Sequence, residues 1–149
     1  MRAILQRVSS AKVVINEKIS GEIGPGLMIL LGITHQDSQE DVNWMIKKIT
    51  QLRIFNDAED KMNLSVVDTG GDLLVVSQFT LYANAKKGNR PSYTDAAPPA
   101  TAIPLYETFL SQLRASFPGK VATGEFGASM QVSLVNEGPV TIILDSSDR

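Results

Sequence analysis

Residues 26–52 read GLMILLGITHQDSQEDVNWMIKKITQL, and the spacing of the apolar residues changes within this stretch. The run from Leu27 to Ile33 is short and almost wholly apolar, which is typical of a buried strand. After Ser38 the apolar residues recur at helical spacing, and Ser38 followed by Asp41 predicts a capping box. The stretch therefore predicts a buried strand followed by a helix from about Gln39 to Leu52.

The residues before this stretch predict antiparallel strands. Apolar and polar residues alternate from Ile4 through Val8, as they do in a half-buried strand. The β-branched run Lys12-Val13-Val14-Ile15 is followed by Asn16-Glu17-Lys18 and then Ile19, which predicts a hairpin. The cluster Gly24-Pro25-Gly26 is a turn signal directly before the buried strand.

The later residues predict further strands and a second helix. The segment from Asp72 to Phe79 contains Leu73-Leu74-Val75-Val76, a run suited to a central strand. The second helix is predicted to begin near Pro104, a good first-turn residue, and to end at Pro118-Gly119. Its predicted apolar face consists of Leu105, Phe109, Leu113 and Phe117. The last predicted strands are Val121–Phe126, Met130–Val135 and Val140–Leu144.

Together these elements predict one α+β domain over residues 1–149. We expect a mostly antiparallel sheet or open β-barrel with two helices packed against it. The length suits about one domain, and no internal repeat of 20–50 residues is present. The alternating strand-helix pattern of doubly wound folds and the glycine-rich phosphate-binding motifs are both absent, which argues against ATP- or NAD-dependent chemistry.

The sequence contains no cysteine and one histidine, His35. This composition excludes disulfides, thiolate nucleophiles, cysteine-based zinc sites and any site with several histidine ligands. His35 lies between the buried strand and the first helix, where we expect a solvent-facing loop residue. The spacing of the acids near predicted turns suggests no metal site, and no cofactor is expected; these acids are Asp57, Glu59, Asp60 and Asp72.

The formal net charge is −2 and the sequence pI is about 5.4. A protein that grips a long stretch of nucleic acid is usually basic, so any nucleic-acid contact should be local, and no DNA binding is expected. No apolar run approaches the roughly 18 residues of a membrane-spanning helix. The N-terminal residues lack the apolar segment of a signal peptide, so a cytoplasmic location is the default expectation.

The segment from Tyr82 to Ile103 shows little periodicity and follows directly on the predicted central strand. Structureless loops beyond about 12–15 residues are uncommon and are usually functional or disordered. Lys86, Lys87 and Arg90 form a small basic cluster on this loop. The cluster fits either a solvated loop or a local contact with phosphate.

Two motifs stand out as candidates for chemistry. Ser77-Gln78-Phe79-Thr80-Leu81 reads either as the end of a strand or as a site whose N–H groups and hydroxyls face a carbonyl or a phosphate. Asn136-Glu137-Gly138-Pro139-Val140-Thr141 separates the last two predicted strands and reads alone as an ordinary turn. A proline there implies a bulge, an edge or a bend, and X-Pro bonds are the only ones with an appreciable cis population.

Taken together, the two motifs resemble the signature motifs of the D-aminoacyl-tRNA deacylase family. The resemblance extends over the whole chain. It includes Met1-Arg2-Ala3-x-x-Gln6-Arg7-Val8, Gly24-x-Gly26-Leu27 and Phe126-Gly127-Ala128-x-Met130. Ser129 stands where many relatives carry an acidic residue, a departure that bears on detail and not on the class.

The resemblance implies an enzyme that hydrolyses the ester between a D-amino acid and the terminal ribose of tRNA. Such enzymes are homodimers with sites at the subunit interface. A cis Gly138-Pro139 bond of one chain would face the Ser77-Gln78-Phe79-Thr80 segment of its partner. This wall would exclude L-side chains but not glycine, so we also expect some hydrolysis of glycyl-tRNA, including glycine mischarged on tRNA(Ala).

For catalysis we expect the main-chain N–H groups of Phe79 and Thr80 to bind the oxyanion, with help from the ribose 2′-hydroxyl. Gln78 and Ser77 would shape the adenosine and ester pocket. Thr80 acting as a nucleophile is the competing mechanism.

The expected substrate-binding residues are Arg7, Lys86, Lys87, Arg90 and Met130. Arg7 would either order the Gly-Pro loop across the interface or pair with an acid. Two rival functions remain at this point: a non-catalytic module that binds RNA ends, and a small esterase that acts on free D-aminoacyl esters.

Overall fold

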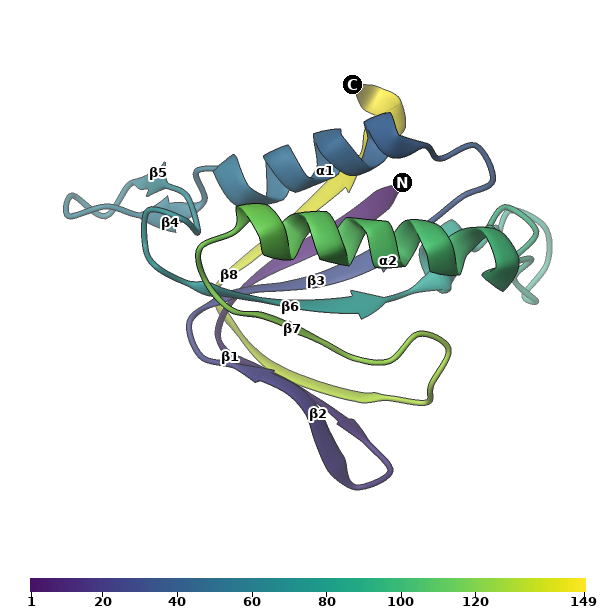
Figure 1. Cartoon of the computed structure of the whole chain (residues 1–149), viewed down its shortest axis with the longest axis horizontal. Helices are drawn as coiled ribbons and strands as arrows, with labels where there is room; N and C mark the ends of the chain where they lie inside the picture. Colours follow the sequence, from purple (N-terminus) through teal and green to yellow (C-terminus); the bar gives the residue numbers. More distant parts are fainter.

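The sheet is built on two long strands, β1 (Arg2–Ile15) and β8 (Gln131–Asp145), which pair antiparallel in the computed structural model of residues 1–149 (Figure 1). The register of this pairing shifts twice around Val8, opposite the Gly138-Pro139 segment. The dipeptide therefore forms the predicted bend inside one continuous strand and does not separate two strands. Likewise, the two strands predicted before residue 16 are halves of β1.

Four further strands complete the main sheet: β2 (Lys18–Ile23), β3 (Gly26–Gly32), β6 (Asp72–Ser77) and β7 (Val121–Thr123). Their order is β2-β1-β3-β6-β7, with β8 also paired to β1. Antiparallel pairs predominate, as predicted, but β3–β6 and β6–β7 are parallel. Parallel neighbours need a long crossover connection, and each of these two connections carries a helix.

The two helices, α1 (Gln39–Gln51) and α2 (Pro99–Ser116), lie side by side on one face of the sheet (Figure 1). The main core lies between them and the sheet and contains fully buried side chains such as Met45, Phe109 and Leu113. This arrangement confirms the predicted α+β fold class. Neither α1 nor α2 combines the length and the apolar character that a membrane-spanning helix needs.

A second, smaller core lies on the opposite face, where the sheet curls. It contains Val13, Met28, Leu74 and Val76, all almost completely buried. The curl brings β2 close to β7, so that a Cβ on Gly21 would lie 2.7 Å from the carbonyl oxygen of Thr123. Glycine is required at this point because the sheet nearly closes into a barrel there.

The prediction for α1 is confirmed, including its capping box at Ser38 and Asp41. The predicted start of α2 is wrong, because the helix begins at Pro99 and Pro104 lies inside it. Pro98 and Pro99 provide the favourable first turn, and the carbonyl of Pro98 accepts the N–H groups of Thr101 and Ala102. The helix ends before Pro118-Gly119, as predicted.

The long segment after β6 is more ordered than its sequence suggests. A short 3₁₀ helix, η1 (Phe79–Tyr82), follows β6, and α2 already includes Ile103. The remaining loop is closed by the pair Asn84–Ser92 and is tied to Thr34 through Ala96. β7 is shorter than predicted, and the small hairpin of β4 (Phe55–Asn56) and β5 (Met62–Leu64) was not predicted.

A buried polar network around Asp41 joins α1 to the C-terminal 3₁₀ helix η2 (Ser146–Asp148). One oxygen of Asp41 accepts from Ser146 Oγ at 2.6 Å and from Arg149 Nη1 at 2.5 Å, and the other accepts the Ser38 N–H at 2.8 Å. Burial raises the pKa of Asp41, but these hydrogen bonds outweigh it and hold the pKa well below its usual value. The ionised carboxylate therefore stabilises the fold.

We predict that Asp41→Asn lowers the free energy of unfolding at pH 7 by about 2 kcal/mol, because hydrogen bonds to a buried charge are lost. The folded-state pKa lies below the unfolded value of 3.8, so the stabilisation is complete above pH of about 4 and declines as the pH falls further. Urea denaturation at pH 7 and pH 3 measures this. Glu107→Gln, on the exposed face of α2, is the control, and a pH-independent difference for Asp41→Asn would contradict the prediction.

Candidate active site

The Ser77-to-Thr80 segment lies where β6 leaves the sheet. Ser77 is the last β6 residue paired with β3, opposite Leu31, and the Gln78 N–H makes a final 2.8 Å hydrogen bond to the Leu31 carbonyl. The chain then turns into η1. The end of a buried strand thus fixes the position of the whole motif.

Two contacts hold η1 against the sheet. Gly32 lies beneath it, and a Cβ there would come within 3.0 Å of Leu81 and 3.1 Å of the Gln78 carbonyl oxygen. Arg2 donates to the Leu81 carbonyl at 2.7 Å and stacks over the ring of Tyr82. The first turn of η1 is therefore positioned by side chains far from it in sequence.

The hydroxyl of Thr80 is hydrogen-bonded to the side-chain amide of Gln78, which donates to it. No imidazole or carboxylate contacts this hydroxyl. The one histidine, His35, is exposed and bonds through Nε2 to the carbonyl of Thr94 at 2.7 Å, which confirms the predicted loop position. Thr80 therefore lacks the adjacent base that normally activates a hydroxyl nucleophile.

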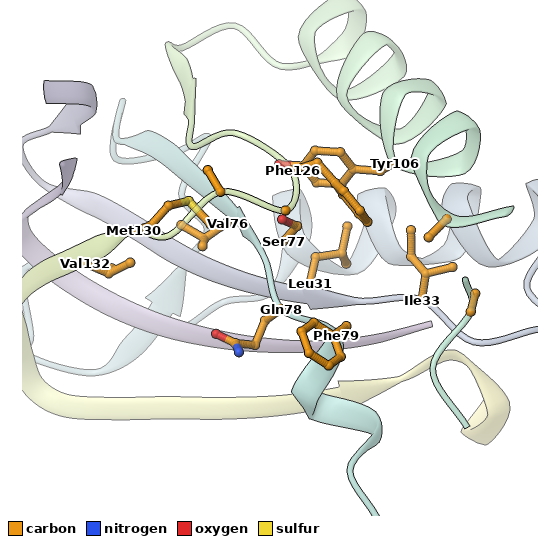
Figure 2. Close-up of a pocket in the computed structure, with 14 residues that line it drawn as sticks. Leu31, Ile33, Val76, Ser77, Gln78, Phe79, Tyr106, Phe126, Met130 and Val132 are labelled. Carbon is orange, nitrogen blue, oxygen red and sulfur yellow. The ribbon is translucent and has the colours of Figure 1, made fainter. Parts of the chain in front are cut away.

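A mostly apolar cavity of about 250 Å³ adjoins the motif (Figure 2). Its walls come from the end of β6, from α2 and from the segment that leads into β8. They include Ser77, Gln78, Phe79 and Met130, which were singled out in the sequence, together with Leu31, Ile33, Val76, Ala97, Ala102, Tyr106, Phe126, Gly127, Ala128 and Val132. The cavity therefore brings most of the first motif together with the Phe126-to-Met130 motif.

Two aromatic rings face each other in the cavity wall. Tyr106 reaches from α2 to Phe126, with 5.6 Å between the ring centroids (Figure 2). Burial raises the pKa of Tyr106 to about 12, so its hydroxyl stays protonated. At the cavity mouth, Phe79 is 55% exposed and packs edge-to-face against Tyr93.

The Gly138-Pro139 bond is cis, and Gly138 has a φ of +134° that favours glycine. The side chain of Asn136 spans the bend, accepting the Val140 N–H at 2.9 Å and donating to Thr141 Oγ1 at 3.0 Å. Neither residue of the dipeptide lines the cavity of its own chain. The structure thus braces the second motif but does not bring it to the first within one subunit.

Arg7 is buried beside this bend. Its Nε donates to the Glu137 carbonyl at 3.0 Å, and its Nη1 donates to the Ile54 carbonyl at 2.9 Å and to Asn56 Oδ1 at 3.1 Å. Arg7 forms no ion pair within the chain. Arg7 links the Gly-Pro segment to the β4–β5 hairpin inside one chain, and it lies outside the cavity.

The basic cluster lies on the loop that the Asn84–Ser92 pair closes. Lys86, Lys87 and Arg90 are exposed, and none of them forms an ion pair. Their charges are therefore free to meet an external anion. No three acidic or histidine side chains converge as a metal site would require.

Tyr106, Ala102 and Phe126 are among the contributors to this site that sequence reasoning missed. Tyr106 fits the helical apolar pattern, which does not distinguish a cavity wall from a packed core, and Ala102 precedes the predicted start of the helix. Phe126 belongs to a motif that the family resemblance includes, and this was the available signal. Only the fold shows that α2 and the Phe126 segment meet at the end of β6.

Comparisons with known proteins agree with the motifs. The family model described as D-Tyr-tRNA(Tyr) deacylase matches residues 4–145. A D-aminoacyl-tRNA deacylase from Flavobacterium psychrophilum is 56% identical over 149 residues, covering 100% of this chain and 99% of the relative. Another, from Clostridioides difficile, is 55% identical over 147 residues, covering 99% and 98%.

Two solved structures share the fold. One, described as a c-Myc DNA Unwinding Element Binding Protein, has a TM-score of 0.92 and 41% identity over 97% of this chain and 98% of its own. The other, described as a probable eukaryotic D-amino acid tRNA deacylase, has a TM-score of 0.79 and 20% identity over 96% and 97%. Because the family model spans nearly the whole chain and full-length relatives are more than half identical, this chain belongs to the D-Tyr-tRNA(Tyr) deacylase family.

Proposed function

We propose that this chain, a hydrolase of D-aminoacyl-tRNA, cleaves the ester at the mouth of the cavity with main-chain N–H groups as its principal catalytic donors. The observation that carries the proposal is the position of Phe79 and Thr80. They open η1 beside the cavity, and the first N–H groups of a helical turn have no carbonyl partner within it. Such donors suit the oxyanion of acyl transfer.

In the reaction, water attacks the ester carbonyl and the carbonyl oxygen becomes an oxyanion facing Phe79 and Thr80. The carbon–oxygen bond to the ribose then breaks and the free amino acid leaves. The ribose oxygen takes up the proton that the attacking water loses, and the neighbouring 2′-hydroxyl relays it. An aminoacyl ester is already reactive, so positioning and oxyanion binding supply the needed acceleration. The Gln78–Thr80 hydrogen bond supports this route over a Thr80 nucleophile.

The cavity supports a role in binding the terminal adenosine. It is smaller than the roughly 300–1,000 Å³ of typical ligand pockets, and its apolar walls suit one flat ring system. Ser77 and Gln78 lie in its wall next to η1, where the ribose and the ester would be placed. Met130 contributes a polarisable thioether, a side chain that adapts well to a ring face.

We assign rejection of L-amino acids to Gly138-Pro139 supplied by a second subunit. Because the dipeptide does not line its own chain's cavity, it needs a partner to meet Phe79 and Thr80. The bend is held rigid by Asn136 and Arg7, which suits a wall that must not yield to a side chain. Glycine has no side chain to exclude, so glycyl-tRNA is a further substrate of this site.

A homodimer is supported by the exposed surface of β8. This strand pairs only with β1, and it exposes Ile143 at 70% and Val135 at 57%. Ile143 lies opposite Ile4 on β1, so apolar side chains of both strands share one outward face. Such apolar exposure at a sheet edge is typical of an interface.

We assign contacts with the tRNA 3′ end to Lys86, Lys87 and Arg90. Their unpaired charges sit on the loop whose base carries Tyr93, next to Phe79 at the cavity mouth. The chain's net charge of −2 favours this local contact over a long nucleic-acid footprint, and it does not favour the DNA binding described for one structural relative. Since charged tRNA is used in translation, we place the activity in the cytoplasm.

We predict that the purified protein releases D-tyrosine from D-tyrosyl-tRNA, releases glycine from glycyl-tRNA(Ala) more slowly, and leaves L-tyrosyl-tRNA intact. Rates of deacylation measured side by side test this, and the same preparation should sediment as two 16.2 kDa chains. Hydrolysis of L-tyrosyl-tRNA would contradict the assignment of L-amino acid rejection to Gly138-Pro139. Binding of tRNA without turnover would favour a module that binds RNA ends, and equal turnover of free D-tyrosine esters would favour a general esterase.

We predict that Thr80→Ala lowers kcat for D-tyrosyl-tRNA by less than about tenfold, because the main-chain N–H of residue 80 remains in place. Thr80→Ser, which keeps a hydroxyl, is the matched variant. If Thr80→Ala lost nearly all turnover while Thr80→Ser retained it, the Thr80 nucleophile would replace main-chain catalysis.

We predict that replacing Lys86, Lys87 and Arg90 together by alanine raises KM for D-tyrosyl-tRNA and leaves kcat nearly unchanged. The salt dependence of binding should become shallower, because each lost contact with a single-strand phosphate removes about 0.7 from the log–log slope. Replacing Lys18, Lys47 and Lys61 gives a control with the same change in charge. Equal tRNA affinity for both triple variants would contradict the assignment.

A further inference from the structure

The hydroxyl of Tyr106 is the one buried side-chain polar atom in the protein that has no hydrogen-bond partner. Tyr106 is 4% exposed and lies on the inner face of α2. A buried hydroxyl without a partner destabilises the free protein, and such groups are rare in folded proteins. Phenylalanine would fill the same space without this cost, so the hydroxyl calls for a partner that the free chain does not contain.

The location of Tyr106 shows where that partner would come from. The residue lines the cavity at the end of β6, and its ring packs against the neighbouring ring of Phe126 in the cavity wall (Figure 2). Most side chains that line the cavity are apolar, and the other polar side chains in its wall, Ser77 and Gln78, lie at the end of β6. A protonated phenol both donates and accepts a hydrogen bond.

The part of the substrate that enters must be the part that every substrate shares. A site that selects by excluding L-side chains leaves D-side chains of any size free to point to solvent, so the amino acid supplies little constant contact. The terminal base of tRNA is constant, flat and apolar on its faces, and it carries donors and acceptors along its edge. Those properties match the ring of Phe126, the thioether of Met130 and the unpartnered hydroxyl of Tyr106.

We propose that the Tyr106 hydroxyl hydrogen-bonds to the edge of the terminal adenine base and is a specificity-determining residue for the 3′ end of the substrate. The inference rests on the proposed function, because it assumes that the cavity holds the terminal nucleoside. The inference identifies the residue that recognises the terminal adenine base. Tyr106 is on α2, whereas the catalytic N–H groups of Phe79 and Thr80 are on η1. The Tyr106 hydroxyl therefore contributes to substrate binding and not to the chemical step.

The test compares wild type, Tyr106→Phe and Thr108→Val. Thr108 also carries a hydroxyl on α2, but it donates to the Pro104 carbonyl and does not line the cavity, so it is the control. We expect Tyr106→Phe to raise KM for D-tyrosyl-tRNA about five- to tenfold, the effect of one neutral hydrogen bond, with kcat nearly unchanged. The thermal unfolding midpoint of the free protein should stay equal or rise, because an unsatisfied hydroxyl is removed.

A second substrate separates the contribution of the terminal base to KM from the other contributions. In D-tyrosyl-tRNA that ends in cytidine instead of adenosine, the purine edge is missing, so the KM values of wild type and Tyr106→Phe should converge. An unchanged KM for Tyr106→Phe on the normal substrate, a lowered unfolding midpoint, or an equal penalty on both tRNA ends would each overturn the inference. Failure of the proposed function would look different, since wild type itself would then release no D-tyrosine.

Discussion

The parallel pairing of β6 with β3 is the constraint on which the other features depend. Both strands are covered on two faces, with Leu73 and Val75 of β6 facing the helices and Leu74 and Val76 facing the second core. Burial of apolar surface on both sides fixes the register, because a slip of one residue would exchange the two sets of side chains. The point at which β6 ends is therefore determined, and with it the place of Ser77.

The candidate site forms where β6 is no longer buried on both faces of the sheet. Beyond Ser77 the chain turns over Gly32 into η1, and α2 and the Phe126 segment leave a cavity that small residues such as Ala102 keep open. In the proposed mechanism the catalytic donors are the main-chain N–H groups at the start of η1, a turn that Gly32 and Arg2 support. A chain with no cysteine, and with its one histidine engaged at Thr94, has few other means of acyl-transfer catalysis.

The polar groups that find hydrogen-bond partners within the chain stabilise the fold, and those that find none lie at the candidate site. Asp41, Arg7 and Asn136 have their hydrogen bonds met within the chain, and each one fixes a segment that would otherwise move. The N–H groups that open η1 and the hydroxyl of Tyr106 have no partner within the chain, the lysines of the basic loop are exposed, and we assign all of these groups to contacts with the substrate. Such groups are tolerated in a stable fold only where a ligand or solvent meets them.

The sequence alone determined the fold class, the first helix with its Ser38–Asp41 cap, and the family, because these depend on local spacing and on motifs that are contiguous in the chain. It placed the start of α2 wrongly at Pro104, since proline favours a first turn but Pro98 and Pro99 already provide one. Only the tertiary structure decided that β6 pairs parallel to β3, that Tyr106 and Phe126 share a cavity with Gln78, and that Arg7 braces Gly138-Pro139. These facts join residues far apart in the chain, and long-range packing, which no local pattern encodes, brings them together.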